Sequence, residues 1–413
     1  MPEPPLAGVR ILSMEQAVAL PVATRHLADM GAEVIRVQSH GRGVPNLSEI
    51  DLTRNKRQLA LDLNVDGAAE AFLRVAATCD VVAHNYTPRV VRKFGIDYES
   101  VRAIKPDIMY VSLTGFGTTG PWGERPLFGP GAEAVSGHNW LIGDPDDWPG
   151  RPGTIVYADT TCGLNTAFAI LAALEERERT GEGQHIDISL YETSVAQLGP
   201  VLAEAQLGAT PARAGNGDAT FALHGVFETQ GHDRHLALAV RDDQAAALMD
   251  ATGIREPTAA AVAAWARNLA AEDAAAALQA RGIAASPVAD AADVATDAHL
   301  GARGFFGIAE RSQGGRSGAY PHVGPAWGGG PAVPLEESRP VGCHSEDILR
   351  DYAGYTATEI RRLIDAGVTG VATPPSPPAR TAEAQQLRVT RGEFSRVDAD
   401  HGGWRAVAGG NRP

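Results

Sequence analysis

The residue with the clearest chemical potential is Asp159, which stands just before the apolar run at residues 164–174. A carboxylate at the edge of an apolar helix commonly caps that helix, because its oxygens accept hydrogen bonds from the first free backbone N–H groups. A carboxylate can also be the nucleophile in covalent catalysis. The immediate sequence leaves both interpretations open, so the segments that accompany Asp159 have to decide between them.

Several segments accompany Asp159 in a definite order along the chain. The upstream segment, residues 115–121, reads Gly-Phe-Gly-Thr-Thr-Gly-Pro, and the downstream segment spans residues 176–190. Further matching segments lie at residues 6–12, 27–37, 55–57, 61–63, 80–86, 286–288, 302–306 and 354–360. In this order they resemble the class III CoA-transferase family over most of the chain, up to about residue 373. The resemblance implies that Asp159 is the catalytic nucleophile.

The reaction of that family is one that a single carboxylate can catalyse. CoA moves from one carboxylic acid to another through a mixed anhydride and an aspartyl-CoA thioester, so the expected partners are an acyl-CoA and a carboxylic acid. No metal and no tightly bound cofactor is expected, because coenzyme A is itself part of the substrate. Anhydrides and thioesters hydrolyse, so the site should close against water. The stretch with Gly215 and Gly217 is a candidate lid, with a plain interdomain loop as the alternative.

Two basic clusters stand out in a chain with a formal net charge of -14. One spans residues 54–57, and the other contains Arg89, Arg92 and Lys93. Such clusters are often ordinary solvated surface, but the resemblance favours an anion site for the phosphates of CoA. The residues that the resemblance places against CoA are Asn85, Tyr86, Lys93, Lys56, Arg57 and Arg42, with His40 as an alternative to Arg42.

The residues expected around the acyl group depart from the family pattern. Val18 stands where an oxalate-using relative carries glutamine, which argues against a small dicarboxylate such as oxalate. Phe128 and Gly129 occupy positions at which related α-methylacyl-CoA racemases carry a His-Asp pair, and racemisation needs a second base across the α-carbon. Gly129 also replaces an acidic residue of the family, for which Glu133 is a candidate substitute. An apolar acyl group is therefore expected.

Three other features have simpler explanations. Residues 115–120 match the glycine pattern of dinucleotide-binding sites, but Pro121 follows in place of the helix that this motif requires. His138 is a lone histidine in a Gly-rich segment, which is typical of a structural residue. Cys162 lies near Asp159 in the sequence, but a cysteine without an adjacent histidine is commonly a small buried hydrophobe. None of the three is expected to be catalytic.

Composition narrows the class of protein. With 413 residues, 44% apolar and 21% charged, the chain is typical of a globular protein of two domains. Its acidity argues against nucleic acid as a partner, and no apolar run is long enough for a membrane span. The N-terminus lacks the pattern of a signal peptide. Three scattered cysteines indicate a reducing compartment, so a cytoplasmic location is expected.

The first half of the sequence alternates between strands and helices. Strands are expected at residues 9–12, 33–37, 58–63, 81–84, 107–113 and 184–190, and helices at 17–30, 67–78, 161–177 and 190–207. Strands separated by helices pair in parallel, so this half should form a doubly wound, Rossmann-like α/β layer. A second unit follows with strands at 225–229 and 235–240 and helices at 242–251, 259–271 and 273–281.

This pattern predicts that the chain is divided into four segments. Residues 1–218 should form the large Rossmann-like domain with the nucleophile, and 219–330 a smaller inserted α/β domain. Within the latter, 312–333 is expected to be a linker rich in Gly and Pro. Residues 331–373, with short helices at 347–352 and 357–366, should return to the large domain, and 374–413 should be a poorly packed Pro-rich tail. The resemblance adds an interlocked homodimer.

The function that these observations favour is CoA transfer through a covalent aspartyl intermediate. A CoA-thioester racemase or isomerase with the same fold is one alternative. A catalytically silent CoA-thioester binding protein is another, because the loops around the expected acyl site are altered. The sequence does not identify the acyl donor or the acceptor.

Overall fold

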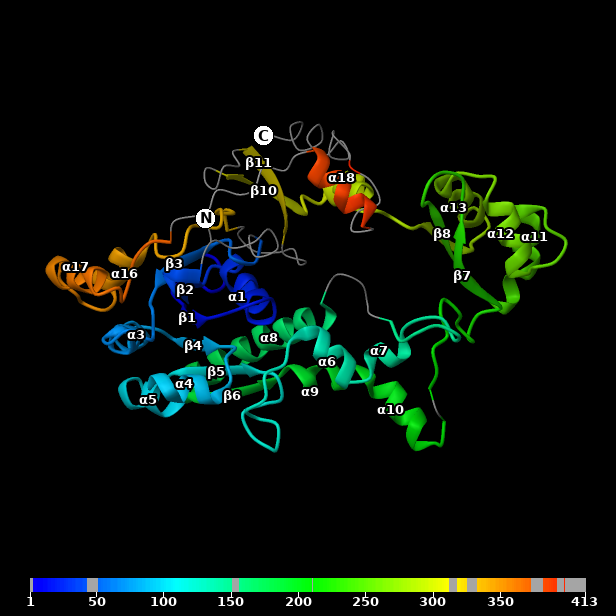
Figure 1. Ribbon diagram of the computed structural model, residues 1–413. Helices are drawn as coiled ribbons and strands as arrows, with labels where there is room; N and C mark the ends of the chain where they lie inside the picture. Colours follow the sequence, from blue (N-terminus) through cyan, green and yellow to red (C-terminus); the bar gives the residue numbers. More distant parts are fainter. Residues whose placement is uncertain are drawn as a thin grey trace. The chain divides into compact units, whose positions relative to one another are not determined.

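The computed structural model in Figure 1 describes residues 3–42, 51–150, 156–209, 211–311, 318–324, 333–372, 382–391 and 397. It consists of two compact units. The first contains Met1–His138, Pro152–Gln206 and Gly301–Val397, and the second contains Asn139–Arg151 and Leu207–Leu300. No helix in the described part of the chain is both long and apolar enough to cross a bilayer.

A six-stranded sheet forms the centre of the first unit. Its strands run in the order β3-β2-β1-β4-β5-β6, and every neighbouring pair is parallel. The strands are β1 (Arg10–Met14), β2 (Glu33–Gln38), β3 (Lys56–Ala60), β4 (Val81–His84), β5 (Met109–Thr114) and β6 (Gln184–Ser189). The predicted parallel α/β layer is therefore confirmed, with strand ends within a few residues of those expected.

The strand order reverses at the middle of this sheet. Strand β1 pairs with β2 on one side and with β4 on the other, so Met14 at its end lies opposite both Val37 and His84. The crossovers from β1 and β4 leave in opposite directions. A crevice forms outside the carboxyl ends of the strands at such a reversal, and this is where open α/β sheets bind ligands.

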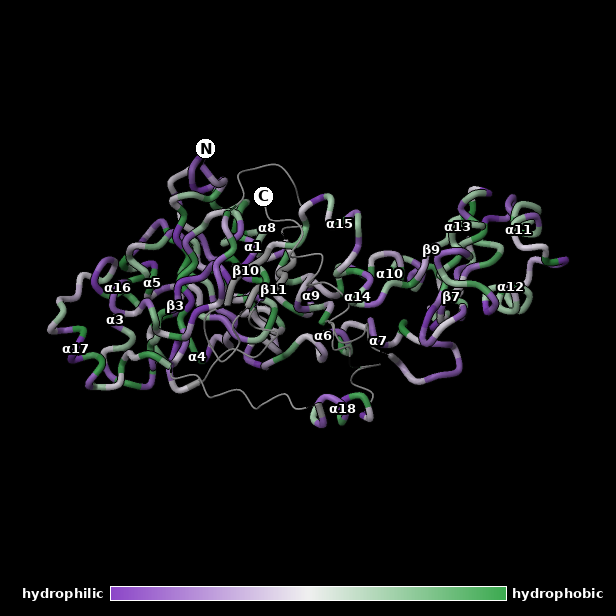
Figure 2. The backbone as a smooth tube through the Cα atoms, turned by 90° about the horizontal axis from the view of Figure 1, so that it is seen from above, coloured by the Kyte–Doolittle hydropathy of each residue, from purple (hydrophilic) through white to green (hydrophobic). Residues whose placement is uncertain are grey.

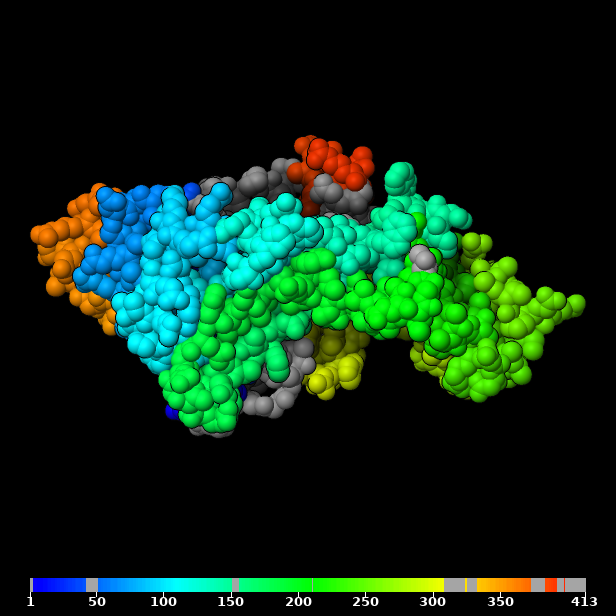
Figure 3. Space-filling view, turned by 90° about the horizontal axis from the view of Figure 1, so that it is seen from below, coloured from blue at the N-terminus to red at the C-terminus, as the bar shows by residue number. Residues whose placement is uncertain are grey.

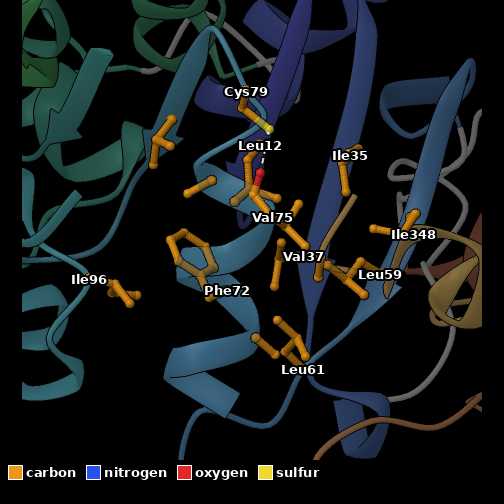
Figure 4. Packing of buried hydrophobic residues seen from close by; sticks show 14 of the residues in the cluster. Leu12, Ile35, Val37, Leu59, Leu61, Phe72, Val75, Cys79, Ile96 and Ile348 are labelled. Carbon is orange, nitrogen blue, oxygen red and sulfur yellow. Dashed lines mark hydrogen bonds between the residues drawn. The ribbon is translucent and has the colours of Figure 1, made fainter. Parts of the chain in front are cut away.

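Helices cover both faces of the sheet. In the described part of the chain up to Gln206, the helices of the first unit are α1 (Ala19–Asp29), α3 (Ala68–Ala76), α4 (Pro88–Phe94), α5 (Tyr98–Ile104), α6 (Gly129–Val135), α8 (Tyr157–Thr180), α9 (Leu190–Val195) and α10 (Gly199–Gln206), of which α10 buries no residue. Helix α7 (His138–Leu141) has most of its residues in the second unit. One apolar cluster joins Leu27 of α1 and Ile170 of α8 to β1, β4 and β5. On the other face, Phe72 and Val75 of α3 point towards Leu12 and Val37 of the strands (Figure 4).

The C-terminal return also packs on the first unit, as expected. Helix α16 (Ser345–Asp351) lies beside β3 and α3, which brings the late residues next to early ones (Figure 3). Ile348 and Ile360, the latter from α17 (Ala357–Asp365), join the same cluster as Phe72. Helix α17 is amphipathic, so hydrophilic and hydrophobic residues alternate along it (Figure 2).

The second unit is built on a three-stranded antiparallel sheet. Its strands are β7 (Leu223–Glu228), β8 (His235–Val240) and β9 (Ala284–Pro287), with β8 in the centre. Apolar residues of this sheet pack against three helices, α11 (Ala245–Thr252), α12 (Ala259–Ala266) and α13 (Ala271–Gln279). Leu236 and Leu248 are fully buried in that core.

Four expectations differ from the structure. The helix expected at 190–207 is interrupted by a short 3-10 turn before α10, where Pro200 cannot donate a backbone hydrogen bond. The expected linker at 312–333 contains strand β11 (Gly318–Val323), which pairs with β10 (Phe306–Arg311). Part of the expected tail forms α18 (Ala382–Thr390). The short helices α14 (Ala291–Ala295) and α15 (Ala298–Ala302) were not expected.

The bounds of the second unit also differ from those inferred from the sequence. It includes Asn139–Arg151, far from the contiguous segment 219–330, and it ends at Leu300 rather than 330. Contacts between distant segments define such units, and local sequence patterns do not contain them. The assignment of domains and the interlocked arrangement stay predictions.

Candidate active site

A cavity of about 210 Å³ lies in the first unit at the carboxyl ends of β1, β4 and β5. The strand ends supply Gln16, Asn85 and Thr114, while α8 supplies Asp159. The other residues around it are Ala17, Ala19, Tyr86, Thr87, Val90, Leu113, Gly115, Pro126, Leu127, Phe128 and Leu190. The fold thus places the expected nucleophile in the crevice at the reversal of strand order.

Asp159 is the third residue of α8 and does not cap it. The N-cap residue is Val156, which makes no side-chain hydrogen bond to the helix. No hydrogen bond found among the described residues ends on the Asp159 carboxylate, although the residue is only 7% exposed. Capping therefore does not explain this aspartate. Its carboxylate is buried at the wall of a cavity without a protein partner in the described part of the chain.

Burial changes the acidity of this carboxylate. Removal from water and, to a smaller extent, the nearby charge of Glu133 together raise the pKa of Asp159 to about 6. Glu133 lies in α6 and is fully buried, and its Oε1 accepts a long hydrogen bond of 3.4 Å from the backbone N–H of Ala158. The structure therefore places Glu133 close to Asp159, and its role as a substitute for the missing acidic residue stays a prediction.

Gly129 is the residue that allows this close approach. A Cβ atom at position 129 would lie 2.4 Å from Oδ2 of Asp159 and 2.0 Å from Cγ1 of Val156. Real Cβ atoms do not approach other atoms so closely, so α6 can begin here only with glycine. The missing acidic residue at position 129 is thus a steric requirement of this particular site.

The Asn85 carboxamide links the ends of two strands. Its Nδ2 donates to the carbonyl oxygen of Gln16 at 2.7 Å, and its Oδ1 accepts from the Gln16 backbone N–H at 2.9 Å. Because these bonds tie the residue after β4 to the residues after β1, they hold one wall of the cavity. Asn85 therefore holds this wall and also lines the cavity, and its expected contact with CoA stays a prediction.

A second cavity, of about 440 Å³, borders the first. The two share Gln16, Tyr86 and Val90, and the second also reaches Lys93 at the end of α4. The Tyr86 backbone N–H donates to Nδ1 of the buried His84 at 3.2 Å, which anchors the shared wall. Tyr86 and Lys93, both expected to contact CoA, therefore lie along one continuous groove.

Lys56 is a correction to the sequence analysis. Its side chain is fully buried, and Nζ donates to Glu15 Oε1 and to Thr24 Oγ1, each at 2.7 Å. Burial lowers the pKa of Lys56 to about 8, while the Glu15 carboxylate favours the charged form. An ammonium group enclosed in this way cannot reach a phosphate, because withdrawing it would leave Glu15 unpaired inside the protein.

The remaining expected contacts lie outside the two cavities. Arg57 pairs with Glu33 at 2.7 Å and donates to the hydroxyl of Tyr352, and it lines neither cavity. Arg42 ends the short helix η1 (His40–Arg42), and its side chain lies outside the described residues. Val18 precedes α1 but does not line the cavity. Phe128 does line it and is largely exposed.

The expected lid lies in the second unit. The Gly215 backbone N–H donates to the Gly143 carbonyl oxygen at 2.9 Å. Gly215 has a left-handed backbone with φ of 56°, a conformation that favours glycine. Gly217 forms the same turn, with its N–H directed to the carbonyl oxygen of Ala214. The lid role of this turn stays a prediction.

Two residues set aside in the sequence analysis are structural here as well. His138 is buried, and its Nδ1 lies 2.9 Å from the Ser136 hydroxyl. Burial raises the pKa of Cys162 to about 12, so its thiol stays protonated at neutral pH. Among the described residues, no group of His, Cys, Asp or Glu side chains could hold a metal ion.

Sequence reasoning missed three residues that matter in the cavity, namely Gln16, Ala17 and Thr114. All three follow or end a strand of the parallel sheet, which is the place where such sheets bind ligands. Ala17 adopts a left-handed backbone with φ of 55°, an uncommon conformation for a residue with a Cβ atom. The strand ends were the signal that could have identified them.

We expect Lys56→Ala to lower the free energy of unfolding by about 3–5 kcal/mol, because it leaves the buried Glu15 carboxylate without its ammonium partner. Lys105→Ala is the matched control. Lys105 pairs with Asp107 at the surface, so its loss should cost less than about 1 kcal/mol. Urea denaturation measures both variants. Equal, small losses would show that the Lys56–Glu15 pair is not a structural element.

Comparisons with known proteins place the chain in one family of enzymes. A model described as CoA-transferase family III matches residues 6–345. Succinyl-CoA:glutarate CoA-transferase of Mus musculus is 35% identical over 253 residues, a match that covers 58% of this chain and 57% of that protein. Succinyl-CoA:mesaconate CoA-transferase of Haloarcula hispanica is 33% identical over 330 residues, covering 71% of this chain and 83% of that protein.

A solved structure has the same fold. The crystal structure of a CAIB/BAIF family protein from Brucella suis has 27% sequence identity and a TM-score of 0.74, and the match covers 85% of this chain and 100% of that one. The chain spans a little over half the length of the mouse relative, whereas the family model spans most of the chain. The protein belongs to CoA-transferase family III.

Proposed function

We propose that this protein transfers CoA between an acyl-CoA and a carboxylic acid, with Asp159 as the nucleophile. The observation that carries the proposal is the buried Asp159 carboxylate, which has no hydrogen-bond partner among the described residues and borders a cavity at the reversal of strand order. A carboxylate in such a place is poorly solvated and therefore reactive. The names of the relatives, which are CoA-transferases, support the same reaction class.

The proposed reaction is a sequence of acyl transfers. An Asp159 oxygen attacks the thioester carbonyl carbon, and the C–S bond breaks to give a mixed anhydride and CoA thiolate. The thiolate attacks the aspartyl carbonyl, which releases the first carboxylate and leaves an aspartyl-CoA thioester. The acceptor carboxylate then attacks that thioester and expels the thiolate again. Attack of the thiolate on the acceptor carbonyl gives the new acyl-CoA and restores Asp159.

The surroundings of Asp159 suit these steps. Leu113, Leu127 and Leu190 form apolar walls around the carboxylate, so a bound acyl group would displace water from the anhydride and the thioester. Because the pKa of Asp159 is raised to about 6, the group is ionised at neutral pH yet remains more basic than an exposed aspartate.

The groove provides a place for the rest of CoA. An acyl group at Asp159 would send the pantetheine arm past Tyr86 and Val90, which border both cavities. The phosphates would then reach the larger cavity with Lys93, whose Nζ lies 4.8 Å from the centroid of the Phe94 ring. In this arrangement Asn85 positions the wall of the first cavity.

The lining of the first cavity favours an apolar monocarboxylic acid. No lysine, arginine or histidine is among the described residues that line it, whereas Leu127 and Phe128 present apolar surface. A second carboxylate would be desolvated there without a cation, which is costly. Several relatives are named for dicarboxylic acids such as succinate and glutarate. The substrate proposed for this chain therefore differs in charge from theirs.

A homodimer is the proposed assembly. Helix α10 buries none of its residues in the first unit, and the apolar side chains of Leu164 and Phe168 on α8 are exposed, the latter by 72%. Apolar surface of this kind commonly marks a protein interface. A cytoplasmic location is part of the same proposal, on the basis of the three free cysteines.

Two alternatives remain testable beside CoA transfer. Racemisation would need a second base facing the α-carbon, and the described cavity wall offers the apolar Phe128 at the corresponding position. A silent binding protein would bind acyl-CoA without turnover. Incubation with acyl-CoA and an acceptor acid separates the three functions, since they give a new acyl-CoA, an inverted α-carbon, or an unchanged ligand.

Asp159→Asn should abolish transfer and stabilise the protein at neutral pH. The pKa of Asp159 is raised from 3.8 to about 6, so the folded state binds more protons than the unfolded state within that range. Stability therefore falls as the pH rises through this window, and the full cost is present above pH 6. We expect the substitution to add about 2–3 kcal/mol to the free energy of unfolding at pH 7, and little at pH 4.

Asp97→Ala is the control for a capping role. The Asp97 side chain accepts a hydrogen bond from the Ser100 backbone N–H at 3.0 Å, so its loss should cost about 1 kcal/mol with transfer unchanged. Chemical denaturation at both pH values and a turnover assay measure these variants. If Asp159→Asn kept wild-type turnover, Asp159 would not be the nucleophile.

Acceptor preference should follow the apolar wall. With a fixed acyl-CoA donor, turnover should be higher for butyrate, isobutyrate and benzoate than for oxalate or succinate, by at least about tenfold in kcat/KM, because a desolvated second carboxylate has no partner. Chromatography of the acyl-CoA products measures this. A preference for oxalate or succinate would contradict the proposed substrate class.

The homodimer can be tested by sedimentation equilibrium. We expect the mass of two copies for the natural protein and a large shift towards the monomer for Phe168→Glu, since a charge would then be buried in the interface. Ile104→Glu, a substitution at another exposed apolar residue of the first unit, is the control and should leave the mass unchanged. A monomeric natural protein would refute the assembly.

A further inference from the structure

Thr114 has a buried hydroxyl group that the known family assignment does not explain. It is the last residue of β5 and lines the same cavity as Asp159. The residue is 5% exposed, and its Oγ1 has no hydrogen-bond partner among the described residues. A polar group of this kind is uncommon in a native protein and calls for a specific cause.

Ser112, on the same strand, has the side-chain hydrogen bonds that Thr114 lacks among the described residues. Ser112 lies two residues earlier, so its side chain points to the same face of the sheet as that of Thr114. Its Oγ is 2.9 Å from Nε2 of His84 and 2.9 Å from Nε2 of His185, so this hydroxyl is fully hydrogen-bonded. At the strand end the sheet neighbours supply no such partner, and the cavity begins there.

Burying an unpartnered hydroxyl costs free energy, and a threonine-to-valine exchange would remove that cost at nearly the same shape. Natural proteins commonly tolerate such a cost at functional sites. A hydroxyl that no protein group engages is available to a bound ligand. Because Thr114 and Asp159 border one cavity of about 210 Å³, a ligand carbonyl attacked by Asp159 would lie close to both.

We propose that the Thr114 hydroxyl donates a hydrogen bond to the carbonyl oxygen of the acyl thioester that Asp159 attacks. As the bond from the Asp159 oxygen to the carbonyl carbon forms, the C=O electron pair moves onto that oxygen, and the Thr114 O–H stabilises the negative charge while keeping its own proton. The C=O bond then re-forms, and the C–S electrons leave on the CoA sulfur. This role rests on the proposed function.

The variant Thr114→Val removes the hydroxyl and keeps the shape. We expect it to lower kcat by about 100- to 1,000-fold, the range for loss of one donor to a developing oxyanion. Thr114→Ser, which keeps a hydroxyl, should recover most of the activity. The melting temperature of Thr114→Val should equal or exceed that of the natural protein, because no protein hydrogen bond is lost.

Thr229→Val is the matched control. Thr229 is the second threonine in the described residues whose buried Oγ1 has no partner; it is 7% exposed and belongs to the second unit, away from the lining of the active-site cavity. This variant should also keep or raise the melting temperature, but with kcat unchanged. The pair of valine variants therefore separates the loss of a buried hydroxyl from the loss of a substrate contact.

Three outcomes would overturn the proposal. The first is a kcat of Thr114→Val within twofold of the natural protein. The second is a lower melting temperature for Thr114→Val together with lost activity, which would show that the hydroxyl has a protein partner. The third outcome concerns ligand binding. It is used if the natural protein transfers no CoA, in which case the proposed function itself has failed. Binding of butyryl-CoA is then measured by calorimetry, and equal affinity of the natural protein and Thr114→Val excludes the contact.

Discussion

Two hydrogen bonds between the Asn85 carboxamide and the backbone of Gln16 hold together the place where the sheet reverses its order. The crossovers from the parallel strands β1 and β4 leave in opposite directions at this point, and one long bond of 3.3 Å from the Asn85 backbone N–H to the Met14 carbonyl oxygen continues the ladder. The two bonds of the Asn85 carboxamide add a second link between the loop after β1 and the residue after β4. Since Gln16 borders both cavities, the shape of the whole groove depends on it. A carboxamide suits this task because it offers one donor and one acceptor side by side.

The proposed active site concentrates polar groups that the fold would be more stable without. Asp159 is ionised at neutral pH although burial opposes its charge, the fully buried Glu133 lies close enough to oppose it further, and the Thr114 hydroxyl has no partner in the described part of the chain. The apolar clusters on the two faces of the sheet offset these costs. The same polar groups therefore lower the stability of the fold and support the proposed reaction. For this reason, uncharged or apolar substitutions at these positions should stabilise the protein and remove its activity.

Much of this arrangement could be predicted from sequence because it depends on local patterns. Alternating strands and helices indicated the parallel sheet, and the segments around Asp159 indicated the family. Burial could not be predicted in the same way. Lys56 looked like a surface cation, yet it is enclosed with Glu15 because β3 lies beside α1 in three dimensions. The partner of the Asn85 carboxamide is Gln16, which lies 69 residues away in the loop after β1. The segment Asn139–Arg151 joins the second unit through contacts that no local pattern contains.

The same burial limits which lysine could attract a phosphate of CoA in the proposed binding mode. The chain has three lysines. Lys56 is neutralised inside the protein by Glu15, and Lys105 is bound by both carboxylate oxygens of Asp107. Of the nearby arginines, Arg92 is paired with Glu124. Lys93 is the lysine that remains beside the groove, at its larger cavity. Because the chain has a net charge of -14, a single cation such as Lys93 would attract a phosphate to one position rather than to the surface in general. Screening by salt limits this attraction to about 8 Å under physiological conditions. In the proposed binding mode, the position of Lys93 beside the groove therefore matters more for CoA than the overall charge does.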